Sequence, residues 1–140
     1  MKIIVVAFII FAVFFYLKNE KTPNNLGVTN NLLAPCPNSP NCAKSQIHYS
    51  SKKHPFDKIK QILSKYPKTR IVKINDNYLH AEFRSKIFSF VDDVEFFYDQ
   101  NNEVIHIRSA SRVGYSDFGV NKHRIDKISA DFTEAVRGDQ

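Results

Sequence analysis

An uninterrupted apolar segment at the N-terminus constrains the fold more than any other feature of the sequence. Residues 3–17 contain no charged residue and no helix breaker, and their one polar side chain is that of Tyr16. As a helix, this segment would span about 22 Å, less than the roughly 30 Å of a bilayer's hydrocarbon core. The segment therefore predicts a single, short membrane helix or the core of a signal peptide.

The residues that follow favour an uncleaved anchor over a signal peptide. A cleavage site needs small residues in an A-x-A-like pattern, whereas Lys18, Asn19, Glu20 and Lys21 come next. Lysines flank the apolar segment on both sides, so the positive-inside rule does not fix its orientation. We expect residues 1–17 to be an anchor or signal segment, and the Asn-rich residues 18–35 to be a flexible linker.

The two cysteines of the chain, Cys36 and Cys42, lie six residues apart in the stretch CPNSPNC. An even number of cysteines behind an export-like N-terminus favours a disulfide in an oxidising compartment. Unpaired structural thiols are an alternative, and a metal site is the least favoured, because His48 gives no standard ligand spacing. Together with the apolar segment, which predicts a single pass through the cell membrane, a disulfide predicts that the domain lies on the extracytoplasmic side.

Two amphipathic helices are predicted in residues 36–140, which have the length of one soluble domain. Apolar residues at helical spacing, with Pro55 before them and Pro67 after them, predict a helix from residue 55 to 65 or 66. A second helix is predicted over residues 122–137, with Asn121 as its N-cap and Gly138 at its end.

Four segments of β-like composition separate these helices, at residues 69–74, 78–85, 94–99 and 104–108. Short Asn-containing stretches between the first and second segments and between the third and fourth predict tight hairpins. The order of elements predicts an α+β fold, in which a four-stranded antiparallel meander carries the N-terminal and C-terminal helices on one face.

The connection before the last predicted helix concentrates arginine, serine and glycine, and reads RSASRVGYSDFGVNKHR at residues 108–124. The helix would begin with basic residues, although a helix N-terminus prefers acidic ones. Because positive charge and free backbone N–H groups converge there, the connection predicts a site for an anionic group such as a lipid headgroup or an envelope component. The candidate anion-binding residues are Arg84, Arg108, Ser109, Ser111, Arg112, Asn121 and Arg124.

An internal ion network is the alternative interpretation of these arginines. Asp92, Asp93 and Asp117 could pair with them and hold the connection against the sheet, as in a structural or adaptor domain that docks a partner protein. A hydrolase that uses Ser109 or Ser111 with a histidine, His106 or His123, is less favoured, because no nucleophile-elbow, metal or phosphate-loop motif is present. The sequence thus gives no catalytic residue, cofactor or metal site, and the expected compartment excludes nucleic acid as a partner.

Three stretches resemble successive blocks of a bacterial family, domain of unknown function 1499: LAPCPNSPNC, YLHAEFRSKIFSFVDDVEF and VIHIRSASRVGYSDFGVNKHRID. The resemblance runs from about Leu33 to the C-terminus and so covers the expected soluble domain. It implies no activity, because the family has no established one. It does imply attachment to a membrane or export across one, in agreement with the N-terminal segment.

Overall fold

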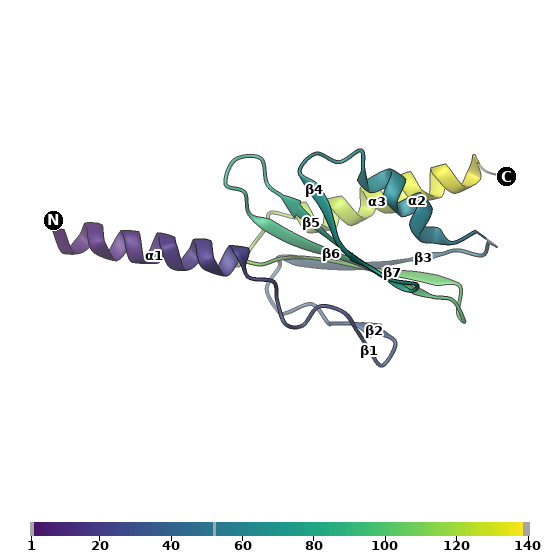
Figure 1. Ribbon diagram of the computed structural model, residues 1–140, viewed down its shortest axis with the longest axis horizontal. Coiled ribbons are helices and arrows are strands. Elements are labelled where there is room, and N and C mark those ends of the chain that lie inside the picture. The colour runs from purple at the N-terminus through teal and green to yellow at the C-terminus, as the bar shows by residue number, and fades with distance from the viewer. Residues whose placement is uncertain (1, 52, 139–140) are drawn as a thin grey trace.

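The N-terminal helix α1 (Lys2–Glu20) extends away from the rest of the chain in the computed structural model, which describes residues 2–51 and 53–138 (Figure 1). The side chains of residues 3–18 are exposed except that of Phe15, which is half-buried. Within the part of the chain that the structure describes, Ile3–Glu20 is the one helical segment long and apolar enough to cross a membrane. Such a helix fits a membrane anchor or a signal sequence.

The domain is built on a five-stranded antiparallel sheet with the strand order β3-β7-β6-β5-β4. Its strands are β3 (Cys42–His48), β4 (Thr69–Ile74), β5 (Tyr78–Arg84), β6 (Val91–Asp99) and β7 (Val104–Ser111). Strands β4 to β7 form the predicted meander, and β6 begins three residues earlier than expected. The antiparallel α+β class is confirmed.

The prediction of four strands was wrong, because β3 forms a fifth at the edge of the sheet beside β7. Its sequence, CAKSQIH, contains only one large apolar side chain, that of Ile47, and its residues alternate between half-buried and exposed along most of the strand. An edge strand has a partner on one side alone and needs few apolar residues. The apolar pattern on which the strand predictions depended is therefore weak in β3.

Both predicted helices of the domain cover one face of the sheet (Figure 1). Helix α2 (Pro55–Leu63) has Pro55 in its first turn and His54 as its N-cap, whose ring nitrogen accepts a hydrogen bond from the backbone N–H of Phe56. Helix α3 (Val120–Arg137) packs beside it. The core between helices and sheet includes Phe56, Ile59, Leu63, Leu79, Phe96, Ile105, Ile107, Ile125, Ile128 and Phe132.

The opposite face of the sheet is covered by the segment that we expected to be a flexible linker. It forms a small hairpin of β1 (Val28–Thr29) and β2 (Leu32–Leu33). Leu33 is buried in a second, smaller apolar cluster with Tyr78 and Phe97 from the sheet. We refer to residues 21–41 as the covering segment, because they place the sheet between two layers of chain and make this face partly inaccessible to solvent.

Candidate functional site

Charged side chains are buried on the sheet face beneath the covering segment. Because side chains alternate along a strand, every second residue of β5, β6 and β7 points to this face. Glu82 lies opposite Asp93, and Glu95 lies between His80 and Arg108 in neighbouring strands. Each of these five residues is at most 4% exposed. Buried charges are stable only when they are paired, so this face must contain a hydrogen-bonded network.

Arg112, directly after β7, is the centre of that network. Its Nη2 donates to Glu82 Oε1 at 2.6 Å and to Asp93 Oδ1 at 2.7 Å, and its Nε donates to Asp93 Oδ2 at 2.8 Å. His80 Nε2 lies 2.8 Å from Asp93 Oδ1, and Arg70 donates to the second oxygen of Glu82 at 2.9 Å. We call His80, Glu82, Asp93 and Arg112 the ion network.

The ion network keeps its acidic members charged. Burial alone would raise the pKa of Asp93, but hydrogen bonds from Arg112 and His80 hold it below the usual value. Burial opposes ionisation of Glu82 as well, yet Arg70 and Arg112 lower its pKa. Burial acts to lower the pKa of Arg112, but Asp93 and Glu82 outweigh it and raise that pKa. At neutral pH the network therefore contains one buried cation between two buried carboxylates.

The same arginine attaches the end of α1 to the domain. Arg112 Nη1 donates to the backbone carbonyls of Asn19 at 3.3 Å and Glu20 at 3.2 Å. The side chain of Asn19 is buried, donates to the carbonyl of Ser89 at 3.1 Å and accepts from the N–H of Val91 at 2.8 Å. These contacts hold the last turn of α1 against the sheet.

Arg84, a predicted anion-binding residue, also binds the end of α1. It forms a bidentate ion pair with Glu20, with distances of 2.8 and 2.9 Å from Nη1 and Nη2 to the two carboxylate oxygens. Carbonyl groups at a helix C-terminus lack helical partners and prefer cations nearby. Arg112 therefore binds carbonyl groups at the C-terminus of α1, and Arg84 adds a second cation there through the side chain of Glu20.

Arg108 forms a second buried cluster on this face, one row away from the ion network. Its Nη1 donates to Glu95 Oε2 at 3.0 Å. The other oxygen of Glu95 accepts from the hydroxyl of Tyr78 at 2.8 Å and from the N–H of Gly27 at 2.7 Å. Nε of Arg108 is fully buried and has no hydrogen-bond partner among the described residues. A buried N–H of a cation without an acceptor is a costly arrangement, and a bound acceptor would relieve it.

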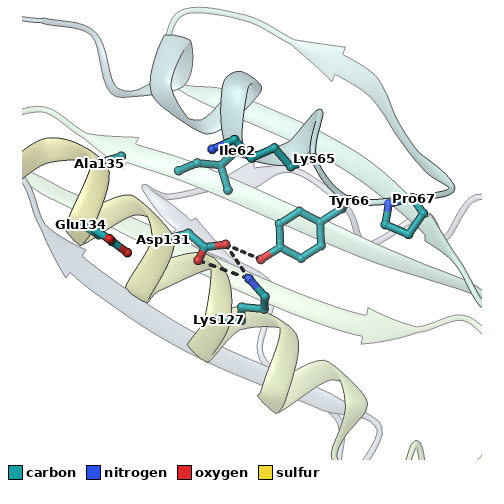
Figure 2. A pocket seen from close by; sticks show the side chains of 8 residues that line it. All are labelled: Ile62, Lys65, Tyr66, Pro67, Lys127, Asp131, Glu134 and Ala135. Atoms are coloured by element: carbon teal, nitrogen blue, oxygen red, sulfur yellow. Dashed lines mark hydrogen bonds and ion pairs between the residues drawn. The ribbon is translucent and has the colours of Figure 1, made fainter. Parts of the chain in front are cut away.

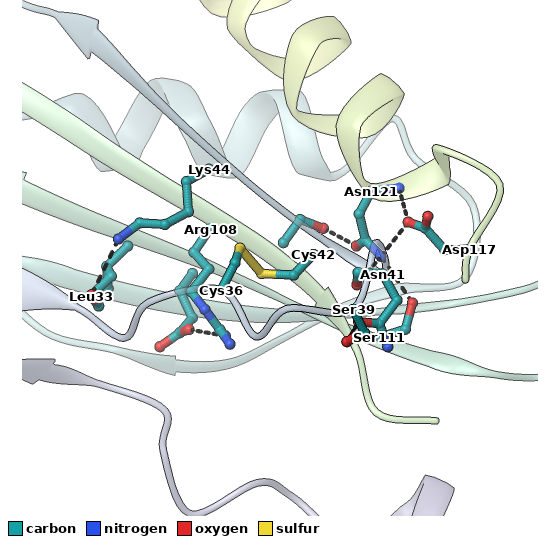
Figure 3. Close-up of a disulfide and its surroundings, with 12 residues drawn as sticks. Leu33, Cys36, Ser39, Asn41, Cys42, Lys44, Arg108, Ser111, Asp117 and Asn121 are labelled. Carbon is teal, nitrogen blue, oxygen red and sulfur yellow. Dashed lines mark hydrogen bonds and ion pairs between the residues drawn. A yellow bond between two sulfur atoms is a disulfide. The ribbon is translucent and has the colours of Figure 1, made fainter. Parts of the chain in front are cut away.

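A cavity of about 530 Å³ lies between the covering segment and the charged face of the sheet. We call it the linker cavity; among the residues that line it are Lys18, Pro23, Cys36, Asp93, Arg108 and Arg112. Figure 3 shows the Arg108 guanidinium beside the chain that carries Cys36. A smaller hollow of about 270 Å³ is also lined by Lys18, Pro23 and Arg112 and extends to Lys21, so the cavity continues toward the end of α1.

The Cys36–Cys42 disulfide forms one wall of this region and confirms the predicted pairing. It links the covering segment to the first residue of β3. Next to it, Asn41 donates to the carbonyl of Gly114 at 2.7 Å. Lys44 donates to the carbonyl of Leu33 at 3.3 Å (Figure 3). The disulfide and these bonds hold the covering segment over Arg108.

Four other candidate residues lie on the helical side of the sheet. Ser109 donates to the side-chain oxygen of Asn121, and Arg124 donates to both residues. Arg124 also pairs with Asp92 at 2.7 Å, and the amide of Asn121 donates to Ser111 at 2.9 Å. The predicted site residues therefore form two groups: Arg84, Arg108 and Arg112 on the charged face, and Ser109, Asn121 and Arg124 beneath α3. Ser111 is bonded to Asn121 and also lines the linker cavity.

The start of α3 differs from the prediction. Gly119 is the N-cap, with a φ of 81° that favours glycine, and Asn121 lies inside the first turn with its side chain buried. Asp117 accepts hydrogen bonds from the backbone N–H groups of Gly119 at 2.9 Å and Asn121 at 2.7 Å. An acid before the helix thus binds the N–H groups that we had expected to face an external anion.

A hollow of similar size, about 560 Å³, lies between α2 and α3. Its polar groups already bind one another: Asp131 accepts from Tyr66 at 2.9 Å and from Lys127 at 3.0 Å (Figure 2). None of its lining residues has a buried side-chain polar atom without a partner, within the described part of the chain. The linker cavity is therefore the better candidate for a binding site.

The sequence reasoning missed several residues of the charged face, among them Lys18, Tyr78, Glu82 and Glu95. Strict alternation along the segment at residues 78–85 places Glu82 with His80, and this signal could have identified it as buried. His106 and Arg108 point to the face opposite Ser109 and Ser111. The described residues contain no hydrogen bond from either serine to a histidine and no cluster of three metal-ligating side chains.

Comparison with known proteins agrees with the resemblance seen in the sequence. No curated protein matches the chain. A family model described as a protein of unknown function, DUF1499, matches residues 32–132. This range begins in β2, contains all five strands of the main sheet and ends in α3. Because the match covers more than half of the sequence, the chain belongs to the DUF1499 family.

Proposed function

We propose that the protein is a membrane-anchored, extracytoplasmic domain that binds an anionic group in the linker cavity. This proposal depends on one observation: the Nε–H group of the buried Arg108 has no hydrogen-bond acceptor among the described residues. Because this Nε has no accessible surface, a phosphate or carboxylate oxygen in the linker cavity would supply that acceptor once the Arg108 side chain turns toward the cavity, and would then form a charge-assisted hydrogen bond. The cavity's volume lies within the roughly 300–1,000 Å³ of small-molecule sites.

Local charge supports an anion rather than a neutral ligand. Arg108 has Lys44 as its cross-strand neighbour, and Glu95 is its carboxylate partner. Lys18 also lines the linker cavity and pairs with no carboxylate in the described residues. Asp93 is the acid in the cavity wall, and it shares Arg112 with Glu82, which has Arg70 as a second cation, so that two arginines balance these two acids. An incoming anion would therefore meet more unbalanced positive charge than negative charge.

The position of the cavity favours a phosphate at the level of lipid headgroups. Lys18 belongs to the last turn of α1 and follows the last apolar residue of that helix, Leu17. If α1 spans a bilayer, Lys18 lies at the boundary between hydrocarbon and headgroups. The linker cavity would then open beside that boundary, where both a lipid phosphate and a soluble phosphate can reach it.

The extracytoplasmic side is proposed on the basis of the disulfide. Disulfides persist in oxidising compartments and are rare in the cytoplasm. A C-terminal fusion to alkaline phosphatase should be active in a bacterial host, and the matching fusion to green fluorescent protein should be dark. A fluorescent fusion without phosphatase activity would place the domain in the cytoplasm and reject this part of the proposal.

Anion binding can be tested by thermal unfolding of the full chain in neutral detergent. Inorganic phosphate should raise the melting temperature beyond the effect of chloride at equal ionic strength, because a ligand stabilises the folded state by RT ln(1 + [L]/Kd). Arg108→Lys keeps a cation beside Glu95 but removes the free Nε–H group, so the phosphate effect should be lost. Arg124→Lys, on the helical side, should keep it.

Two further measurements complete the test. Micelles doped with an anionic phospholipid, compared with free phosphate, distinguish a lipid headgroup from a soluble ligand. Equal melting temperatures of the parent protein in phosphate and in chloride, in micelles with and without the anionic phospholipid, would reject anion binding in the linker cavity.

A structural or adaptor domain is the second candidate. It is favoured by the complete internal pairing of Arg112, whose three nitrogens all donate to groups of the chain itself. An arginine so satisfied is not available to an external anion, and its role is to join α1 to the sheet. Rejection of anion binding would leave this candidate as the preferred one.

A further inference from the structure

Two loops at one end of the sheet expose large apolar side chains next to the anchor helix. The loop between β5 and β6 presents Ile87 and Phe88, which are 83% and 71% exposed. The connection between β7 and α3 presents Tyr115 and Phe118, which are 74% and 97% exposed. In Figure 1 both loops lie at the end of the sheet from which α1 leaves. We call these four side chains the apolar loop tips.

The β5–β6 loop is in direct contact with the apolar surface of α1. The ring of Phe90 packs edge-on against Phe15, with 5.7 Å between centroids, and Phe88 stacks on Phe90 at 5.4 Å. Phe15 precedes the last apolar residue of the helix, Leu17, by two positions, a rise of about 3 Å. Phe90 therefore lies at the depth where the apolar part of α1 ends.

This position is fixed by the contacts of Asn19. Its side chain holds the carbonyl of Ser89 and the N–H of Val91, so the base of the β5–β6 loop is bonded to the last turn of α1. Ser85 and Phe90 close the loop with two hydrogen bonds, of 2.9 and 3.0 Å. The loop cannot move along the helix axis without breaking these bonds, and its depth follows that of α1.

The length of the apolar segment favours the same placement. Residues 3–17 as a helix span about 22 Å against a hydrocarbon core of roughly 30 Å. A short span draws flanking groups toward the bilayer or thins it locally. Aromatic side chains are enriched at the membrane interface, and lysine side chains there extend toward the headgroups. Lys86 in the loop, and Lys18 and Lys21 at the end of α1, suit this role.

From these observations we infer that the apolar loop tips insert into the interface of the bilayer that holds α1, so that the domain docks on the membrane in one orientation. This inference rests on the proposed anchoring by α1. The surface that the apolar loop tips contact is a lipid bilayer, because the tips continue the apolar surface of α1 and lysines lie near them in the chain. Insertion would also hold the linker cavity, which Lys18 lines, against the headgroups.

The chain contains no tryptophan, so single tryptophan substitutions can report the depth of each position. We would reconstitute the full chain in vesicles of phosphatidylcholine and phosphatidylglycerol, with and without brominated acyl chains. Phe88→Trp and Phe118→Trp probe the two loops. Phe11→Trp probes α1, and Gln100→Trp probes the β6–β7 turn, at the opposite end of these antiparallel strands.

We expect blue-shifted emission and quenching by brominated lipid for Phe88→Trp, Phe118→Trp and Phe11→Trp. Gln100→Trp should emit as a water-exposed residue and remain unquenched. Quenching of Phe11→Trp without quenching of either loop probe would overturn the inference and leave the anchor intact.

Two other outcomes would also overturn the inference. Blue-shifted but unquenched loop probes would mean that a protein surface, such as a second copy of the chain, covers the loops. An unquenched Phe11→Trp would reject the anchoring by α1, and with it both the inference and the membrane part of the proposed function.

Discussion

Removal of the guanidinium of Arg112 is the sharpest test of the ion network. Arg112→Gln shortens the side chain and removes the positive charge that Glu82 and Asp93 share. Both carboxylates stay buried, at 4% and 1% exposure. Each keeps one partner, because Arg70 still reaches Glu82 and His80 still reaches Asp93. The variant therefore leaves two buried acids with incomplete compensation.

Breaking a buried ion pair by removing one partner costs about 3–5 kcal/mol. Since the remaining partners satisfy one oxygen of each acid, we expect a loss near the lower limit, about 3 kcal/mol. For a domain of this size, the melting temperature falls by roughly 4 °C for each kcal/mol, so a decrease of about 12 °C is expected. Arg112→Lys keeps the positive charge but not the planar guanidinium with its several donors, and it should lose less stability than Arg112→Gln.

The measurement is urea unfolding of the full chain in detergent, followed by near-ultraviolet circular dichroism of the six tyrosines. Lys122→Gln is the control, because it removes an exposed pair with Asp126 and should leave the midpoint unchanged. The difference between parent and Arg112→Gln should shrink on acidification, as the unpaired acids of the variant take up protons. A loss below about 1 kcal/mol at neutral pH, which is typical of a surface pair, would refute a buried network.

Three further predictions concern stability. The carboxyl groups of Glu82 and Asp93 have lowered pKa values, so their ionised forms stabilise the folded state at any pH above the unfolded pKa of about 4. This contribution to the free energy of unfolding is lost as the pH falls below that value, and acid titration of the unfolding midpoint should show the decrease. The double variant Cys36→Ser, Cys42→Ser opens a loop of seven residues and should lose about 2 kcal/mol, while alkylation of the unreduced parent should leave its mass unchanged. Gly119→Ala places a side chain at a φ of 81° and should destabilise by about 1 kcal/mol, whereas Gly138→Ala, at a φ of −71°, should be neutral or stabilising in thermal melts.

Much of the fold followed from apolar periodicity. The two helices of the domain, the meander and the apolar N-terminal helix all have long or clearly alternating patterns, and their positions were predicted to within a few residues. Strand β3 could not be found in this way, because Lys44, Ser45 and Gln46 interrupt any apolar pattern. Its place depends on pairing with β7, which is a tertiary interaction that local sequence does not encode.

The covering segment was misread for a related reason. Asn, Pro and Gly are typical of flexible linkers, and here they form the turns of a short hairpin, in which Asn30 and Asn31 have φ values of 52° and 57°. Leu33 is buried under Tyr78 and Phe97, whose faces are known only once the register of β5 and β6 is known. Composition alone does not distinguish such a packed segment from a free one.

The candidate site shows the same limit. Arg108, Arg112 and Arg124 lie close in sequence, and the expectation was that they converge on one ligand. Alternation places Arg108 on the face opposite Ser109, and α3 carries Arg124 to the helical side, where it binds Asp92. The acids that balance Arg112 come from β5 and β6, so their identity depends on strand register rather than on any local motif.

The charged face also helps to specify the register of the sheet. Its covering segment supplies only Leu33 as a buried apolar side chain, with Val28 beside it, so apolar burial specifies this face weakly. Arg112 bonds at once to β5, β6 and the end of α1. A slip of β7 by one residue would bring Ser111 or Val113 into its place and deprive Glu82 and Asp93 of the buried cation that they share. The ion network therefore favours this strand alignment, and through Asn19 and Glu20 the same alignment fixes the direction in which α1 leaves the domain.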